Sequence, residues 1–136
     1  MDVRFLVCAD SVALDQRRNT LSLFHVIEEW AIPAFPWVVV HFAIVALFER
    51  MANEPNDLEV QVVIQLGEQE LFRGPLAVRF QERLRMRAIT EVGGLVLPNP
   101  GLLNVLMTLG DRQLASWSIV VNNIGQPVAQ PELPLQ

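Results

Sequence analysis

The feature that most constrains the fold of this chain is a repeated pattern of short alternating segments, each ended by a turn sequence. The last third shows it most clearly. Every second residue from Leu103 to Leu109 is apolar, and this run lies between a turn at Pro98–Gly101 and another at Gly110–Asp111. Neighbouring side chains on a β-strand point to opposite faces, so a period of two indicates a strand with one buried face. We predict a hairpin here, with residues 114–121 as the returning strand.

The same pattern recurs along almost the whole chain. Its clearest amphipathic example runs from Leu58 to Leu66, followed by a polar turn and a returning segment from Leu71 to Phe80. Gly74-Pro75 in that segment predicts a bulge or an edge strand, because proline cannot donate a ladder hydrogen bond. Further alternating segments are predicted at 3–9, 21–27 and 83–92.

The run from Val38 to Phe48 differs because apolar side chains occupy both parities. Such runs are typical of a central strand covered on both faces, although a buried helix has the same signature. The β-branched residues at its start favour the strand. The pattern leaves open whether the second face is covered by the same chain or by a neighbour.

Seven or eight short strands, with turns about every 8–12 residues, predict an all-β fold. The expected architecture is an antiparallel β-sandwich with Greek-key or jelly-roll-like connections. Residues 1–123 suit a single domain. Residues 124–136 carry Pro127, Pro131 and Pro134 without periodicity, and we expect a mobile tail there.

The composition is rich in apolar residues and poor in charge. Hydrophobic residues make up 51% of the chain and charged residues 18%, whereas an average domain has about 25% charged residues. Either the core is large for the size of the chain, or part of the surface is covered by another copy or another protein. The net charge of −5 gives no support for binding nucleic acid or an anionic membrane.

Cysteine content and hydropathy bear on the compartment. Cys8 is the single cysteine, which excludes an intramolecular disulfide and favours a reducing compartment. The longest apolar run spans about eleven residues, where a membrane helix needs about twenty. We predict a cytoplasmic protein.

The order of these features resembles a family of short bacterial proteins of unknown function. The opening Phe5–Asp10, the proline-rich break at Pro33–Pro36 and the close Gly94–Gly101 carry the resemblance. The position after that Pro-Gly is often aromatic in the family, and here it is Leu102. The resemblance covers nearly the whole chain. It implies a β-sandwich and implies no activity, because the family carries no catalytic residues to transfer.

No catalytic set emerges from the residue types. A nucleophile–base pair needs histidine beside serine or cysteine, and His25 and His41 both lie in apolar runs. With Asp10 or Glu49 they would make a metal pattern, but nothing in the spacing requires it. We therefore predict no enzyme, no metal site and no cofactor.

An arginine stripe is the sharpest local signal. Arg83, Arg85 and Arg87 share one parity with Arg79 and Gln81. On one strand their guanidinium groups would project from one face, about 7 Å apart, ready to meet phosphates or carboxylates. The simpler explanation is a polar face paired across the sheet with glutamates, the candidates being Glu59, Glu68, Glu70 and Glu91. In the family that the chain resembles, a loop often falls at 81–85, which would scatter the stripe.

Aromatic residues flank the proline break. Trp30, Phe35 and Trp37 are candidates for a partner-binding hot spot, or they plug one end of the sandwich. Taken together, these features predict a non-catalytic protein-interaction or assembly module that binds a protein partner or self-associates. Two alternatives stay open: binding of a small ligand or carbohydrate beside Trp30 or Trp37, and contact with phosphate or nucleic acid through the arginine stripe.

Overall fold

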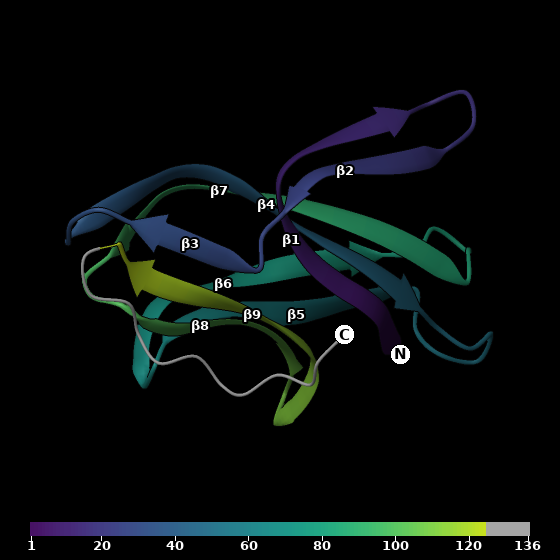
Figure 1. Ribbon diagram of the computed structural model, residues 1–136. Helices are drawn as coiled ribbons and strands as arrows, with labels where there is room; N and C mark the ends of the chain where they lie inside the picture. Colours follow the sequence, from purple (N-terminus) through teal and green to yellow (C-terminus); the bar gives the residue numbers. More distant parts are fainter. Residues whose placement is uncertain (125–136) are drawn as a thin grey trace, which may run out of the picture.

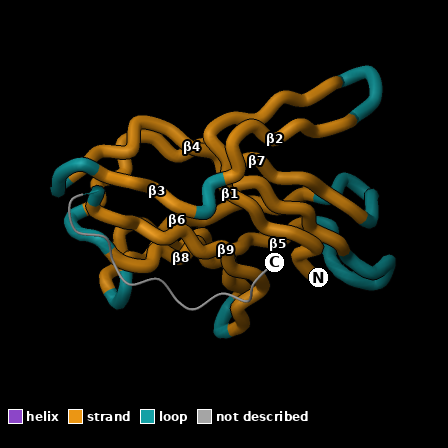
Figure 2. Tube along the Cα trace, in the orientation of Figure 1, coloured by secondary structure: helices purple, strands orange, loops and turns teal. Residues whose placement is uncertain are grey.

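The computed structural model describes residues 1–124, which form two stacked β-sheets (Figures 1 and 2). One sheet has the strand order β2-β1-β4-β7 and the other β3-β9-β8-β5-β6. All pairings are antiparallel except the parallel pairing of β3 with β9. The strands are β1 (Asp2–Asp15), β2 (Thr20–Val26), β3 (Glu29–Ile32), β4 (Trp37–Glu49), β5 (Asp57–Leu66), β6 (Gln69–Arg79), β7 (Arg85–Leu97), β8 (Gly101–Leu109) and β9 (Arg112–Asn123).

The predicted all-β sandwich is confirmed, with nine strands in the described residues instead of seven or eight. The additional strand is β3, whose four residues are too few to show an alternating pattern. β3 exists because the chain changes sheets just before it. The amide of Ile27 donates to the carbonyl of Cys8 in the first sheet, at 2.8 Å, and the carbonyl of Glu28 accepts from Val120 in the second, at 3.0 Å. The predicted tail at 124–136 lies, apart from Ile124, outside the described residues.

The predicted central strand is β4, which lies between β1 and β7. Phe42, Ile44 and Phe48 point into the core and are completely buried. Ala43 and Val45 alternate with them and are also completely buried within this one chain, so no neighbour is needed to cover that part of β4. The first residues of β4 differ from the prediction, because Val38 and Val40 are 52% and 82% exposed.

Both β4 and β7 contain one point at which the core-facing side chains change from even-numbered to odd-numbered residues or the reverse. In β7 the core side chains change parity between Val92 and Leu95, across Gly93 and Gly94. Gly94 has φ +70°, a left-handed conformation that side chains disfavour. The change of parity places Val38 and Val40 on the outer face of β4, whereas Val39 between them points into the core.

The edges of the two sheets decide where a site can form. β6 and β7 are each paired on one side only, and they contact one another across the sandwich. β6 carries Gly74 and Pro75, so the predicted edge position of this dipeptide is confirmed. Among residues 1–124 there is no helix of the length and apolarity needed to cross a membrane.

Candidate functional site

A pocket of about 710 Å³ lies at the N-terminal end of β7. There the edge strands β6 and β7 of the two sheets meet the β1–β2 hairpin. Apolar side chains of Leu14, Leu47 and Ile89 form part of its wall. Figure 1 shows the hairpin rising away from the two layers, and Leu14 lies near its turn. Four of the ten arginines of the chain line the same pocket: Arg79, Arg83, Arg85 and Arg87.

These four arginines do not come from one strand face. Arg85 and Arg87 begin β7 and Arg79 ends β6, whereas Arg83 lies in the turn between the two strands. Gln81 and Glu82 have φ angles of 53° and 67° in that turn. The prediction of a straight row of Arg83, Arg85 and Arg87 is therefore wrong. The turn nevertheless returns the chain, so that all four arginines line one pocket.

Two of the guanidinium groups have partners within the fold. Arg85 lies directly opposite Glu49 on β4, and its Nε donates to Glu49 Oε2 at 2.7 Å. Arg87 contacts Asn19 in the hairpin turn, with a nitrogen–oxygen distance of 3.2 Å to the carbonyl. Cross-strand pairing with a glutamate thus holds for Arg85, but none of the four glutamates named from the sequence supplies it. Glu70, one of those four, is paired with Arg73 at 2.7 Å.

The other two guanidinium groups are free within the described part of the chain. Arg79 and Arg83 are exposed, and neither side chain makes a hydrogen bond or ion pair with residues 1–124. Their nearest carboxylate in sequence is Glu82, which accepts a hydrogen bond from Asn56 at 2.6 Å. Asp57 lies opposite Arg79 in the strand register, but no ion pair joins them. The pocket therefore combines an apolar wall with two guanidinium groups that make no ion pair among residues 1–124, and guanidinium groups are the donors best suited to carboxylates and phosphates.

Arg50 holds the turn that carries Arg83, and the sequence pattern did not single it out. Its side chain is almost fully buried, and its Nε donates to the carbonyl of Arg83 at 2.8 Å. Its backbone amide donates to the carbonyl of Leu84 at 2.9 Å, and its guanidinium lies 5.5 Å from the ring centroid of Phe80. The only sequence signal was a charged residue directly after a strongly apolar strand.

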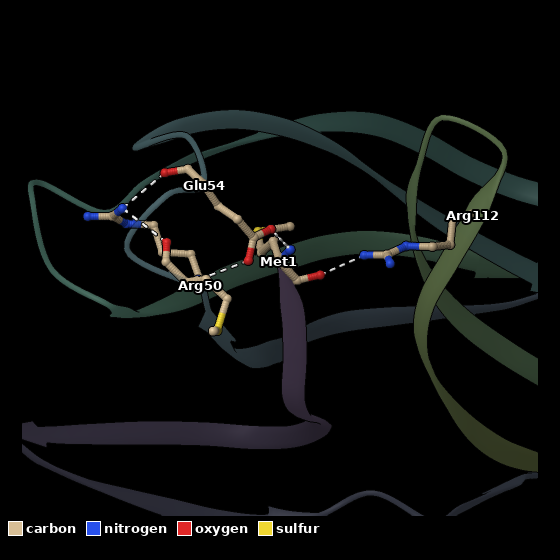
Figure 3. A network of polar contacts seen from close by, with 5 residues as sticks. Met1, Arg50, Glu54 and Arg112 are labelled. Carbon is tan, nitrogen blue, oxygen red and sulfur yellow. Dashed lines mark hydrogen bonds and ion pairs between the residues drawn. The ribbon is translucent and has the colours of Figure 1, made fainter.

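A polar network links Arg50 to the first residue of the chain (Figure 3). Arg50 donates to the carbonyl of Glu54 at 3.0 Å, and the Glu54 carboxylate accepts from the amide of Met51 at 2.9 Å. That carboxylate also pairs with the amino group of Met1. Arg112 from the far sheet donates to the carbonyl of Met1 at 2.6 Å. The hydrogen bonds from the Met1 amino group and the Met51 amide lower the pKa of Glu54.

The three predicted aromatic candidates do not form one exposed surface. Trp30 packs edge-on against Phe42, with ring centroids 5.4 Å apart, and Phe35 is half-buried against the core. Of the three, Trp37 alone keeps an exposed surface, of 40%. Of the two roles considered, closing one end of the sandwich fits Trp30 and Phe35 better than a partner-binding hot spot does.

The residues considered for catalysis or metal binding lie apart. His25 is exposed with φ 55°, and His41 lies 3.7 Å from Glu91. Residues 1–124 contain no group of three histidine, cysteine or carboxylate side chains placed to hold a metal ion. Burial raises the pKa of the Cys8 thiol to about 12, so it is not a thiolate near neutral pH.

A second pocket, of about 630 Å³, continues along β7 and was not predicted from the sequence. Residues 90–96 form one wall and residues 69–72 of β6 form the other. The ring of Phe72 lies over Gly74, where an added Cβ would be 2.9 Å from its Cζ atom. The one local signal for this pocket was the pair of side-chain-free glycines, 93 and 94.

The fold and site define this protein as a two-sheet β-sandwich with an open side between β6 and β7. The chain belongs to a family of unknown function, DUF6941, whose sequence profile matches residues 4–122. That match reaches from β1 to β9, and the predicted membership of a family of unknown function is confirmed. No curated protein matches the chain.

Proposed function

We propose that this protein is a non-catalytic protein-interaction module whose arginine-lined pocket binds an acidic segment of a partner protein. The observation that carries the proposal is the pair of exposed guanidinium groups of Arg79 and Arg83, which have no partner among residues 1–124. Arg85 and Arg87 line the same pocket and are positioned by contacts with Glu49 and Asn19. Positioned arginines beside free ones suit carboxylates, which accept two parallel N–H bonds.

An acidic protein segment suits this pocket better than nucleic acid. The chain carries a net charge of −5, so a long polyanion reaching beyond the pocket would meet a negative protein. The walls formed by Leu14, Leu47 and Ile89 offer contact to apolar side chains, which a phosphate backbone lacks. We place the module in the cytoplasm, in keeping with the buried and unpaired Cys8.

The carbohydrate alternative draws less support from the geometry. Trp30 is engaged with Phe42, which leaves Trp37 as the one exposed stacking surface of the two. A sugar site needs several converging polar groups beside the stacking ring, so one exposed indole is a weak basis for this alternative.

Binding of a fluorescein-labelled peptide of eight glutamates tests the proposal by fluorescence anisotropy. Arg79→Ala/Arg83→Ala should weaken binding by up to about 30-fold, since an exposed ion pair contributes up to about 1 kcal/mol. Arg73→Ala is the matched control, because Arg73 is exposed, pairs with Glu70 and lies outside the pocket. If the double variant and the control bind the peptide with equal affinity, the proposal is wrong. A single-stranded DNA of equal charge that displaces the peptide would favour a phosphate ligand instead.

A further inference from the structure

The two pockets follow one another along the same strand. The first is lined by Arg85, Met86, Arg87 and Ile89, and the second by residues 90–96. Their opposite wall is β6, with Ala77 and Arg79 beside the first and residues 69–72 beside the second. The two pockets are consecutive along β7, and we refer to them together as the β7 groove.

The backbone of β7 is available for pairing along this groove. β7 pairs with β4 on one side, and on the other side no strand of residues 1–124 pairs with it. An edge strand presents a row of unpaired N–H and C=O groups. The facing edge, β6, is interrupted by Pro75, whereas β7 has thirteen residues and no proline. β7 is therefore the less protected of the two edges.

Side chains do not fill the groove at its far end. A Cβ added at Gly94 would meet no atom within 4 Å, and the Phe72 ring lies back over Gly74. The Thr90 hydroxyl is buried there without a hydrogen-bond partner in the described structure. Beside Gly94, therefore, the β7 groove is not filled by side chains.

We propose that the acidic partner segment is extended and adds to the edge of β7 as a further strand. This inference rests on the proposed function, because the guanidinium groups at one end of the groove provide the charge complementarity. Arg85 and Arg87 lie on the outer face of β7, while Met86 and Ala88 point toward the core. Paired residues share a face, so the partner places acidic side chains opposite the arginines and apolar side chains between them. The occupant is a segment that alternates acidic and apolar residues.

The length of the segment follows from strand geometry. A strand advances about 3.3 Å per residue, so seven residues extend over about 20 Å. Seven residues of β7 reach from Arg85 to Glu91. Glu91 carries a carboxylate on the same outer face as the arginines, and its side chain is 68% exposed, so it would repel an acidic residue placed opposite it. Acidic residues of the partner therefore belong at the arginine end of the β7 groove.

The probe is the palindromic peptide Val-Glu-Val-Glu-Val-Glu-Val, blocked at both ends, which reads the same in both directions. Two versions carry backbone N-methyl groups, one on the valines and one on the glutamates. The N–H groups of alternate residues point to opposite sides of a strand, so only the valines or only the glutamates direct their amides toward β7. The version methylated on that set should lose at least about tenfold in affinity, and the other version should stay within about threefold of the parent peptide. The unmethylated peptide should also slow hydrogen exchange of β7 amides and leave those of β6 unchanged.

The outcomes separate the two proposals. If both methylated peptides bind like the parent and Arg79→Ala/Arg83→Ala still weakens binding, strand addition is wrong and the acidic-segment function stands. If the wild-type protein binds neither this peptide nor the octaglutamate, the proposed function fails and the strand inference fails with it.

Discussion

Arg87 on β7 donates to the backbone carbonyl of Asn19, a residue 68 positions earlier in the chain, at 3.2 Å. A second nitrogen of the same guanidinium lies 3.4 Å from the Asn19 side-chain oxygen. This contact ties the tip of the β1–β2 hairpin to the free edge of the sandwich. It also keeps Leu14 beside Leu47 and Ile89, and so maintains one wall of the arginine-lined pocket.

Replacing Arg87 with alanine should release the hairpin tip without unfolding the protein. Exposed contacts of this kind contribute up to about 1 kcal/mol, so global stability should change little. Amides at residues 16–20 should exchange faster, as measured by hydrogen–deuterium exchange. Arg85→Ala is the control, because its partner Glu49 is on β4 and not in the hairpin. Unchanged exchange in Arg87→Ala would show that the hairpin is held by its own strands.

Replacing Arg50 with leucine should destabilise the fold by about 3 kcal/mol. The change removes two part-buried hydrogen bonds that the Arg50 guanidinium donates to the carbonyls of Arg83 and Glu54, and a hydrogen bond from a charged group contributes about 1.5–3 kcal/mol. Urea unfolding measures the effect. Arg50→Lys should not restore stability, because a point charge cannot donate in two directions as a planar fork does. Arg73→Ala should leave the midpoint of urea unfolding essentially unchanged, because Arg73 is exposed.

Stability should fall in acid through Glu54. Its pKa is lowered in the folded protein, first by the hydrogen bond from the Met1 amino group. A carboxyl with a depressed folded pKa stabilises the fold above its unfolded pKa, and this contribution is lost as pH falls through the folded value. Glu54→Gln should therefore flatten the dependence of Tm on pH below about pH 5. Glu59→Gln, at an exposed position on β5, should leave the slope unchanged, and a wild-type slope in Glu54→Gln would contradict the assignment.

The Cys8 thiol should be unreactive until the protein unfolds. Its side chain is completely buried and burial raises its pKa to about 12, well above the pKa of an ordinary thiol, which is about 8.5. Modification by Ellman's reagent at pH 8 should be at least about a thousandfold slower in the native protein than in denaturant. Prompt reaction of the folded protein would show that the first sheet opens locally.

The sequence by itself determined most of the strands and the class of fold. The alternation from Leu58 to Leu66 and from Leu103 to Leu109 reports burial of one face, which is a local property that the chain displays directly. The Gly74-Pro75 dipeptide limited its segment to a bulge or an edge strand, because proline removes a donor wherever it stands. β3 was not predicted, because its four residues pair in parallel with a strand about ninety residues away in the sequence. So short a segment contains no pattern that indicates a distant partner.

Only the tertiary structure decided where the site lies. The sequence placed Arg83, Arg85 and Arg87 on one strand, whereas the fold put Arg83 in a turn held by the buried Arg50 and brought Arg79 and Asn19 beside them. The stacking of the two sheets decides which strand edge stays unpaired. It also decides which guanidinium groups have partners. Those contacts join residues far apart in the chain, so local periodicity carries no record of them.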